Sequence, residues 1–528
     1  MFVATVTAIL ALATVSASTP AYTFNEPTDF FSDTFVEADS KFVDVCTTVA
    51  GAQNLRTYTH PTALGKQGEA LTSRVCLLGP RDAPNVLYAL TGVHGAEGFS
   101  GAAAMLKFML EMSNASSVYL KPVATRYVLH HMVEPWGASF GFKENEDNVD
   151  QLKNSNGLYE KGHPGWTSEN RANPIFVELI GALDIPHLDT YKPTFSIPLQ
   201  RFQAMGVKYG EAFGASLRKG QMQRQVGMSF WGTEQSWSSS VQKMVAADYL
   251  SGAEKVVLLD LHTAVGEYGK WSIYAYDLHS ESVFQQWIEL SGIDKSMTNL
   301  NVAGVALKPW QFYTYIEKFL GSGSKSGGSS KSSGSAELAE KKMVRVVWEA
   351  GTYPQEQYQL FLVLGMHCRF FMTTTSFTKE ECAQFEAKIS QYFYPNFDDY
   401  KKIAMEDLEV ASKALFVGMK SWFGEESSPS SDDDEVGRWV FALALGSYVT
   451  VVLVGALFVL KKGRRSGRDD EDVDGGEVEL RGDEGATRDV NPVNGGFALD
   501  RSERLTKMER KVVAFDIDHS QCMHTLEK

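Results

Sequence analysis

Short apolar segments rich in β-branched residues recur along the first 423 residues of the chain. Mainly apolar runs of this length are typical of strands buried on both faces of a sheet. They lie at residues 86–90, 126–133, 256–261 and 344–348. Helical patterns occupy about 100–113, 355–371, 379–393 and 399–420. The alternation predicts an α/β fold, with a mixed, mainly parallel sheet flanked by helices.

One segment inside this domain has a different composition. Residues 321–334 are nearly all Gly, Ser and Lys, so they cannot bury apolar surface. We expect a flexible insertion between two strands. A solvated surface loop and an active-site lid are both compatible with it.

The two ends of the chain carry hydrophobic segments of another kind. Residues 1–17 are small, apolar and uncharged, which predicts a secretory signal peptide ahead of a globular ectodomain at 18–423. An acidic stalk follows at 424–438. Residues 439–460 contain no charge and are long enough to cross a lipid bilayer. The sequence therefore predicts one transmembrane helix after the α/β domain.

Charge sets the expected orientation of this helix. Acidic residues precede it, whereas Lys461, Lys462, Arg464 and Arg465 follow it, so its C-terminal side should be cytosolic. We expect a single-pass type I membrane protein with an extracellular or lumenal catalytic domain. The polar tail at 461–528 should be disordered and could bind a cytosolic partner.

Composition narrows the class of partner and the compartment. The formal net charge of −15 argues against a nucleic-acid-binding protein, which needs a basic face. Of five cysteines, Cys46, Cys76, Cys368 and Cys382 fall in the ectodomain, where they could form two disulfides in any of three pairings. Asn114 begins an N-glycosylation sequon, so the ectodomain could be a glycoprotein.

The strongest chemical signal follows the strand at 86–90. His94 and Glu97 stand three residues apart in a glycine-rich turn that precedes a helix. This spacing can bring both side chains to one metal ion, and both are ordinary zinc ligands. A surface His with a Glu placed near a helix N-terminus is the alternative.

Two later strands end in groups that could complete such a site. His262 follows the strand at 256–261, with Asp260 two residues earlier on the same face, where it could orient a ligand. Glu349 closes the strand at 344–348, an expensive place for a charge unless something pairs with it. Because carboxyl ends of neighbouring strands gather at one edge in α/β folds, these residues could meet His94.

At this point the chain resembles the zinc carboxypeptidase superfamily, and most closely its uncharacterised domain-of-unknown-function branch. The resemblance rests on His94-x-x-Glu97, on the Asp-Leu-His-Thr of 260–263 and on the Glu-Ala-Gly-Thr-Tyr-Pro of 349–354, which occur in the same order. Further matches are the Glu-Pro-Trp-Gly of 134–137, the segment 145–150 and the Trp-Gly-Thr-Glu of 231–234.

The resemblance implies a zinc metallohydrolase. By it His94, Glu97 and His262 would bind Zn²⁺, and Glu349 would be the general base and later the general acid. The substrate would be a peptide. The family's Asn and Arg that clamp a terminal carboxylate are replaced here by Leu152 and Lys153.

An upstream arginine pair of that branch is replaced by Phe142 and Lys143. We expect Lys143 and Lys153 to contact the substrate, although Lys cannot reproduce the bidentate grip of Arg. Two other functions therefore remain open: deacylation of small N-acyl amino acids, and a catalytically inactive, receptor-like ectodomain.

Overall fold

The computed structural model describes residues 22–113, 125–163, 166–183, 196–210, 212–213, 216, 219–222, 229–293, 315–316, 320, 342–353 and 378–424. They all fall in the first of the two units into which contacts divide the chain, Met1–Pro429. The predicted signal peptide, the Gly/Ser-rich segment, the helix expected at 355–371, Asn114, the stalk after residue 424, the membrane span at 439–460 and the tail lie outside the described residues. Among the helices that are described, none has the length and apolar character needed to cross a membrane.

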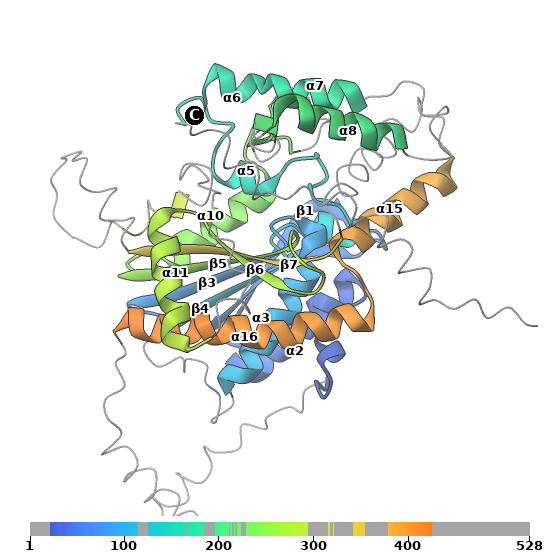
Figure 1. Ribbon diagram of the computed structural model, residues 1–528. Coiled ribbons are helices and arrows are strands. Elements are labelled where there is room, and N and C mark those ends of the chain that lie inside the picture. The colour runs from blue at the N-terminus through green and yellow to red at the C-terminus, as the bar shows by residue number, and fades with distance from the viewer. Residues whose placement is uncertain are drawn as a thin grey trace, which may run out of the picture. The chain divides into compact units, whose positions relative to one another are not determined.

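A seven-stranded sheet forms the centre of the domain (Figure 1). Its strands occur in the order β1-β2-β4-β3-β5-β7-β6. The central pairs β4–β3, β3–β5 and β5–β7 are parallel, whereas the pairs nearer the two edges are antiparallel. The predicted mixed sheet is therefore confirmed. The strands are β1 (Leu55–Leu64), β2 (Ala70–Leu78), β3 (Asn85–Thr91), β4 (Thr125–His131), β5 (Lys255–Ala264), β6 (Trp271–Ala275) and β7 (Met343–Gly351).

The four predicted strands correspond to β3, β4, β5 and β7. These are the parallel strands, and every residue of β3 and β4 is buried, which explains the apolar residues at the centre of each. β5 and β7 run further than predicted, so His262 and Glu349 lie within the last residues of their strands and not beyond them. The edge strand β1 has a mixed exposure pattern, and its sequence gives no comparable signal.

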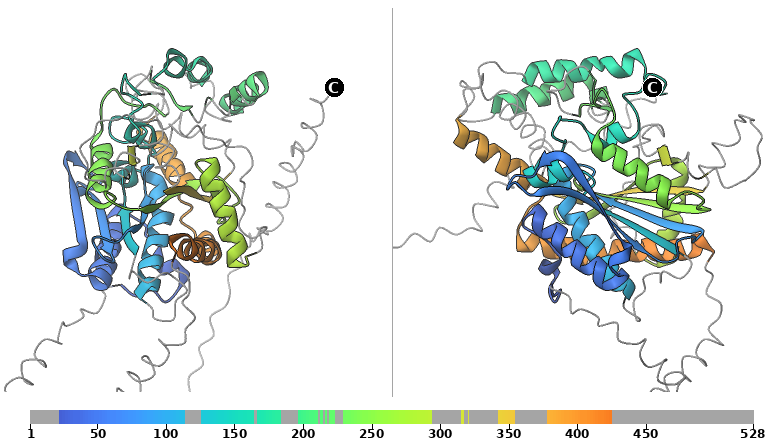
Figure 2. Two further views of the ribbon diagram at one scale, coloured as in Figure 1. Left: turned by 90° about the vertical axis from the view of Figure 1, so that its left-hand side faces the viewer. Right: turned by 180° about the vertical axis from the view of Figure 1, so that it is seen from behind.

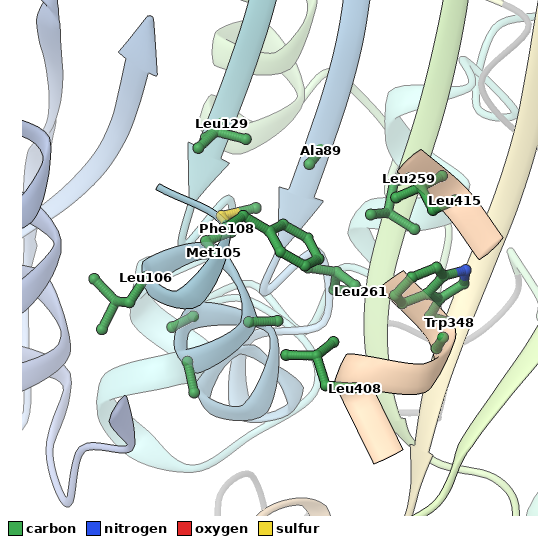
Figure 3. Close-up of a cluster of buried hydrophobic side chains, with 14 of the residues drawn as sticks. Ala89, Met105, Leu106, Phe108, Leu129, Leu259, Leu261, Trp348, Leu408 and Leu415 are labelled. Carbon is green, nitrogen blue, oxygen red and sulfur yellow. The ribbon is translucent and has the colours of Figure 1, made fainter. Parts of the chain in front are cut away.

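One face of the sheet is covered by long helices. These are α2 (Phe35–Ala50), α3 (Gly98–Ser113), α11 (Leu278–Ser291) and α16 (Asp398–Phe423). Their apolar side chains form one large core with the sheet, in which Phe108 of α3 and Leu408 of α16 meet Leu261 and Trp348 (Figure 3). The helices predicted at 100–113 and 399–420 are confirmed as α3 and α16.

The opposite face carries α10 (Trp237–Tyr249), which packs on a second apolar cluster (Figure 2). The remaining helices surround the carboxyl ends of the parallel strands or lie beyond them. They are α4 (Pro135–Phe140), α5 (Gln151–Ser155), α6 (Ser168–Ala172), α7 (Pro174–Leu183), α8 (Ser196–Tyr209) and α15 (Lys379–Phe393), with short 3-10 turns at η1 (Pro27–Phe30), η2 (Ala52–Asn54) and η3 (Gly95–Glu97). The helix predicted at 379–393 is confirmed as α15.

A disulfide ties α2 to β2. Cys46 and Cys76 are bonded, which selects one of the pairings that the sequence left open. Cys382 of α15 is also disulfide-bonded. Both bonds are of the kind found in proteins that fold in an oxidising compartment.

Candidate metal centre

A tight turn connects β3 to α3 and carries the first two candidate ligands. His94 immediately precedes η3, and Glu97 is the last residue of that turn. Gly95 allows the turn to pack against α4, because a Cβ at this position would approach the backbone nitrogen of Ala138 to 2.3 Å. The backbone N–H of Gly95 donates to Lys143 O at 3.1 Å. The glycine is therefore required by close packing of the turn.

The structure brings His94, Glu97 and His262 together. Their candidate ligand atoms all lie within 4.8 Å of one another, and all three residues are buried. Glu97 is between the two imidazoles: its Oε1 is 3.1 Å from His94 Nδ1, and its Oε2 is 2.7 Å from His262 Nδ1. The three residues predicted as zinc ligands thus form one cluster.

The far nitrogens of both histidines face carboxylates. His94 Nε2 lies 3.3 Å from Asp150 Oδ1, and His262 Nε2 lies 2.7 Å from Asp260 Oδ2. Asp260 also accepts a hydrogen bond from the Tyr276 hydroxyl at 3.0 Å. A carboxylate on the distal nitrogen fixes the orientation of a metal-binding histidine, which leaves Nδ1 of each ring for the metal.

Asp260 was expected in this place from its position on the strand, whereas Asp150 was not. Asp150 belongs to the matched segment 145–150, but the sequence offered no reason to connect it with His94, 56 residues away. It caps the short helix α5, a local role that its sequence does indicate.

Neighbouring charges shift the titration of the ligands. Burial would raise the pKa of Glu97, but the adjacent imidazoles outweigh it and lower that pKa to about 2. Burial would likewise lower the pKa of His262, but Asp260 and Glu97 raise it well above its usual value. Glu97 is therefore ionised, as a metal ligand must be, and a metal at His262 would have to displace a proton.

Glu349 stands beside this cluster because of strand register. β5 and β7 are parallel neighbours, and His262 pairs directly with Glu349. The residue is partly exposed, yet its Oε2 atom is buried and has no hydrogen-bond partner among the described residues. Burial, followed by Glu97 and Asp260, raises the pKa of Glu349 well above its usual value, although His262 opposes the shift. A buried carboxyl oxygen without a partner is costly, so Oε2 is placed to receive a proton or a ligand.

The two predicted substrate lysines lie close to the ligands. Lys143 and Lys153 are both 6% exposed. Lys143 Nζ donates to Asp150 Oδ2 at 2.6 Å, the same carboxylate that faces His94. Burial lowers the pKa of Lys153, whereas Asp150 and Glu144 outweigh burial and raise the pKa of Lys143. Their contact with the substrate stays a prediction.

The other matched motifs support the loops around the cluster. Glu134 caps α4 by accepting from the backbone of Trp136 and Gly137, and it also accepts from Ser238 at 2.8 Å. Burial and the nearby Glu146 raise the pKa of Glu134 to about 8. In the Trp-Gly-Thr-Glu motif of 231–234, the carbonyl oxygen of Trp231 accepts a hydrogen bond from the side chain of Asn154 at 2.8 Å. These motifs therefore hold α4 and α5 in place.

The donor set fits a zinc ion. Two imidazole nitrogens and one ionised carboxylate are the usual protein ligands of a catalytic zinc, which keeps a further position for water or substrate. The buried, unpartnered oxygen of Glu349 lies on the strand next to His262, where a general base is needed. The predicted zinc site is therefore compatible with every side chain that the structure places there.

Comparisons with known proteins agree with the predicted family. A model of the family described as "Protein of unknown function (DUF2817)" matches residues 31–407. No curated protein matches the sequence.

Several solved structures are similar to parts of the chain. Carboxypeptidase A from Helicoverpa armigera is 12% identical, with a TM-score of 0.34 over 73% of this chain and 78% of that chain. A metallo-carboxypeptidase from Burkholderia cenocepacia is 7% identical, with a TM-score of 0.32 over 73% of this chain and 69% of that chain. Bovine thrombin-activatable fibrinolysis inhibitor is 10% identical, with a TM-score of 0.33 over 73% of this chain and 97% of that chain.

Proposed function

The chain belongs to the DUF2817 family of proteins of unknown function, and from this premise we propose that it is a membrane-anchored, zinc-dependent hydrolase of amide bonds. One observation carries the proposal. Three buried ligand side chains, His94, Glu97 and His262, converge within 4.8 Å of one another, and the carboxyl group of Glu349 is in register beside them.

The side chains divide the reaction between them. Zinc, when bound by His94, Glu97 and His262, supplies a Lewis acid that polarises the scissile carbonyl and activates water. Glu349 accepts the proton of the attacking water, so that the oxygen can form its bond to the carbonyl carbon. Glu349 then returns the proton to the amine as the carbon–nitrogen bond breaks. Burial raises the pKa of Glu349, which helps this carboxyl group to hold the proton between the two steps.

The lysines favour a substrate that carries a carboxylate. Lys143 and Lys153 place two cationic side chains next to the ligand cluster, and buried ammonium groups attract anions. Either a peptide with a free C-terminus or an N-acyl amino acid has such a group. We propose that the substrate belongs to this class. Its carboxylate would lie at the two lysines, and the amide bond to be cleaved would lie at the zinc.

Location forms part of the same proposal. The Cys46–Cys76 disulfide supports an extracellular or lumenal ectodomain. The predicted signal peptide at 1–17 and the predicted span at 439–460 would give a type I protein with a cytosolic tail.

Metal analysis of the purified protein tests the centre directly. We expect about one zinc per chain, and loss of that zinc in His94→Ala. His60→Ala is the matched control, because His60 is partly buried and pairs with Glu146 at 3.0 Å, outside the ligand cluster. A zinc-free protein, or equal zinc in both variants, would contradict the proposal.

Activity is then measured on peptides and on N-acyl amino acids of the same terminal residue. Hydrolysis of the N-acyl amino acids but not of the peptides would identify a deacylase. Zinc binding without hydrolysis of either group would point to the receptor-like alternative.

A further inference from the structure

A cavity lies outside the ligand cluster. It has a volume of about 580 Å³ and is lined by five separate parts of the chain, none of which contributes a candidate ligand or Glu349. These parts are residues 33–36 before and within α2, residues 66–69 between β1 and β2, Phe99 of α3, residues 138–141 at the end of α4, and residues 383–397 of α15 and the segment after it. α15 is visible at the right of Figure 1. A volume of this size is typical of small-molecule sites.

Aromatic rings form much of its wall. Phe99 and Tyr394 are stacked, with ring centroids 5.0 Å apart and an interplanar angle of 20°. Phe35 and Phe140 also line the cavity, and Phe397, which is 45% exposed, stands at its rim. An aromatic lining of this kind favours an apolar ligand body.

The charged residues of the wall are mostly acidic. Asp33, Glu69 and Glu386 line the cavity together with one cationic side chain, that of Lys66, so the lining has a formal charge of −2. Lys401, which lies outside the lining, pairs with Asp33, its Nζ being 3.5 Å from Asp33 Oδ1. Lys66 Nζ is 4.0 Å from Glu386 Oε2, too far for a hydrogen bond. Glu69 accepts from the backbone of Gln67 at 2.8 Å and from Ser139, so its carboxylate is held at the wall. A hydrogen bond from Asn396, at 2.9 Å, orients Asp33 in the same way.

We propose that this cavity binds an organic cation, an ammonium or guanidinium group on an apolar or aromatic body. The oriented carboxylates would attract the charge, and the aromatic lining would hold the body. An anionic ligand would meet an excess of like charge. The cation could be a free amine or the basic side chain of a polypeptide.

The position of the cavity connects it with the candidate metal centre. Phe99 lies two residues after Glu97, and α4 packs directly on the turn that contains His94 and Glu97. An occupant would therefore contact the two elements that hold this turn. The inference nevertheless stands apart from the proposed hydrolase activity, because it rests on different residues and its test requires no catalysis.

Calorimetric titration of the full chain with three probes tests the chemistry. Phenethylamine, 2-phenylethanol and 3-phenylpropionate carry a cation, a neutral group and an anion on the same ring. We expect phenethylamine to bind at least about tenfold more tightly than the alcohol, and the acid to bind least. Equal binding of amine and alcohol, or no binding of the amine at up to about 10 mM, would overturn the proposal.

Variants locate the site. Glu69→Gln and Glu386→Gln each keep the size of the side chain, and we expect the double variant to reduce the preference for the amine to less than about threefold. Glu380→Gln is the matched control, because Glu380 is exposed on the same helix α15 and does not line the cavity. If the double variant has a lowered melting temperature, the single variant Glu386→Gln is used for the same comparison of amine and alcohol binding. An unchanged preference in a folded variant would refute the assignment of the cavity.

A peptide pair distinguishes the two sources of the cation. Acetyl-Phe-Lys-amide is compared with acetyl-Phe-Glu-amide and with phenethylamine. Tighter binding of the lysine peptide than of phenethylamine supports a polypeptide ligand, and weaker binding supports a free amine. Equal binding of the two peptides would count against the cationic site.

Discussion

Substitution of Glu349 by Gln isolates the proton-transfer step of the proposed reaction. The amide keeps the shape of the side chain but cannot accept the proton of water. Because Glu349 Oε2 is buried without a hydrogen-bond partner among the described residues, the neutral amide should not lower stability. The ligand side chains are unchanged, so zinc should remain bound.

The size of the effect follows from the role assigned to the carboxylate. A positioned general base contributes about 10²- to 10⁴-fold to rate, which corresponds to roughly 3–5 kcal/mol of transition-state stabilisation. We therefore expect kcat to fall by about this factor, while KM stays within about threefold because the variant leaves Lys143 and Lys153 in place. Loss of kcat with normal zinc content would separate the base from the metal ligands.

The assay is hydrolysis of the best substrate from the peptide and N-acyl amino acid comparison, with zinc content and melting temperature measured on the same preparation. Glu267→Gln is the matched control, since Glu267 is an exposed carboxylate in the loop after β5. A kcat within about threefold of the unmodified protein would refute the assigned role. Loss of zinc from Glu349→Gln would instead show that the residue is a ligand.

Three further predictions concern the surroundings of the site and the stability of the domain. Asp260→Asn should weaken zinc affinity by about 10- to 100-fold in chelator competition, because Asp260 Oδ2 is 2.7 Å from His262 Nε2; unchanged affinity would remove its orienting role. Burial lowers the pKa of His130 to about 3 and that of His131 to about 4, so the unfolded chain binds more protons below about pH 6.5 and stability should fall as the pH falls. His131→Phe keeps an aromatic ring against Phe42. Between pH 7 and pH 5 this variant should lose about 2 kcal/mol less of its free energy of unfolding, measured by urea unfolding, than the unmodified protein. An equal loss in both proteins would contradict the lowered pKa of His131. Replacing both Cys46 and Cys76 by Ala opens a link across 30 residues and should cost about 2–4 kcal/mol, measured against the unmodified protein under non-reducing conditions; equal stability of the two proteins would contradict this expectation.

The sequence predicted the buried centre of the fold better than its edges. β3, β4, β5 and β7 are covered on both faces, so most of their residues are apolar and the strands are easily identified. β1 alternates irregularly between partly and fully exposed residues, and β6 has only five residues. Neither carries a hydrophobic pattern long enough to distinguish a strand from a loop.

The candidate site was predictable to the extent that its residues follow strands. His94, His262 and Glu349 could be identified because polar side chains at the ends of apolar strands are conspicuous. Asp150 could not, because it lies in the loop that precedes α5 and reaches His94 only through the folding of α4 and α5 around the turn. The bond from Lys143 to Asp150 depends on the same loops.

Core packing and the candidate site share one feature, the register of β5 and β7. Leu261 and Trp348 pair across these strands and point into the core beneath the sheet, where they meet Phe108 and Leu408 (Figure 3). The next residue of each strand, His262 and Glu349, must point to the opposite face, because side chains alternate along a strand. If the positions of β5 and β7 in the sheet shifted by one residue, His262 and Glu349 would point into the apolar core, and Leu261 and Trp348 would point away from it. The burial of Leu261 and Trp348 stabilises this register, and the same register places His262 beside Glu349. The apolar core therefore determines the geometry of the site, although it is far from any substrate.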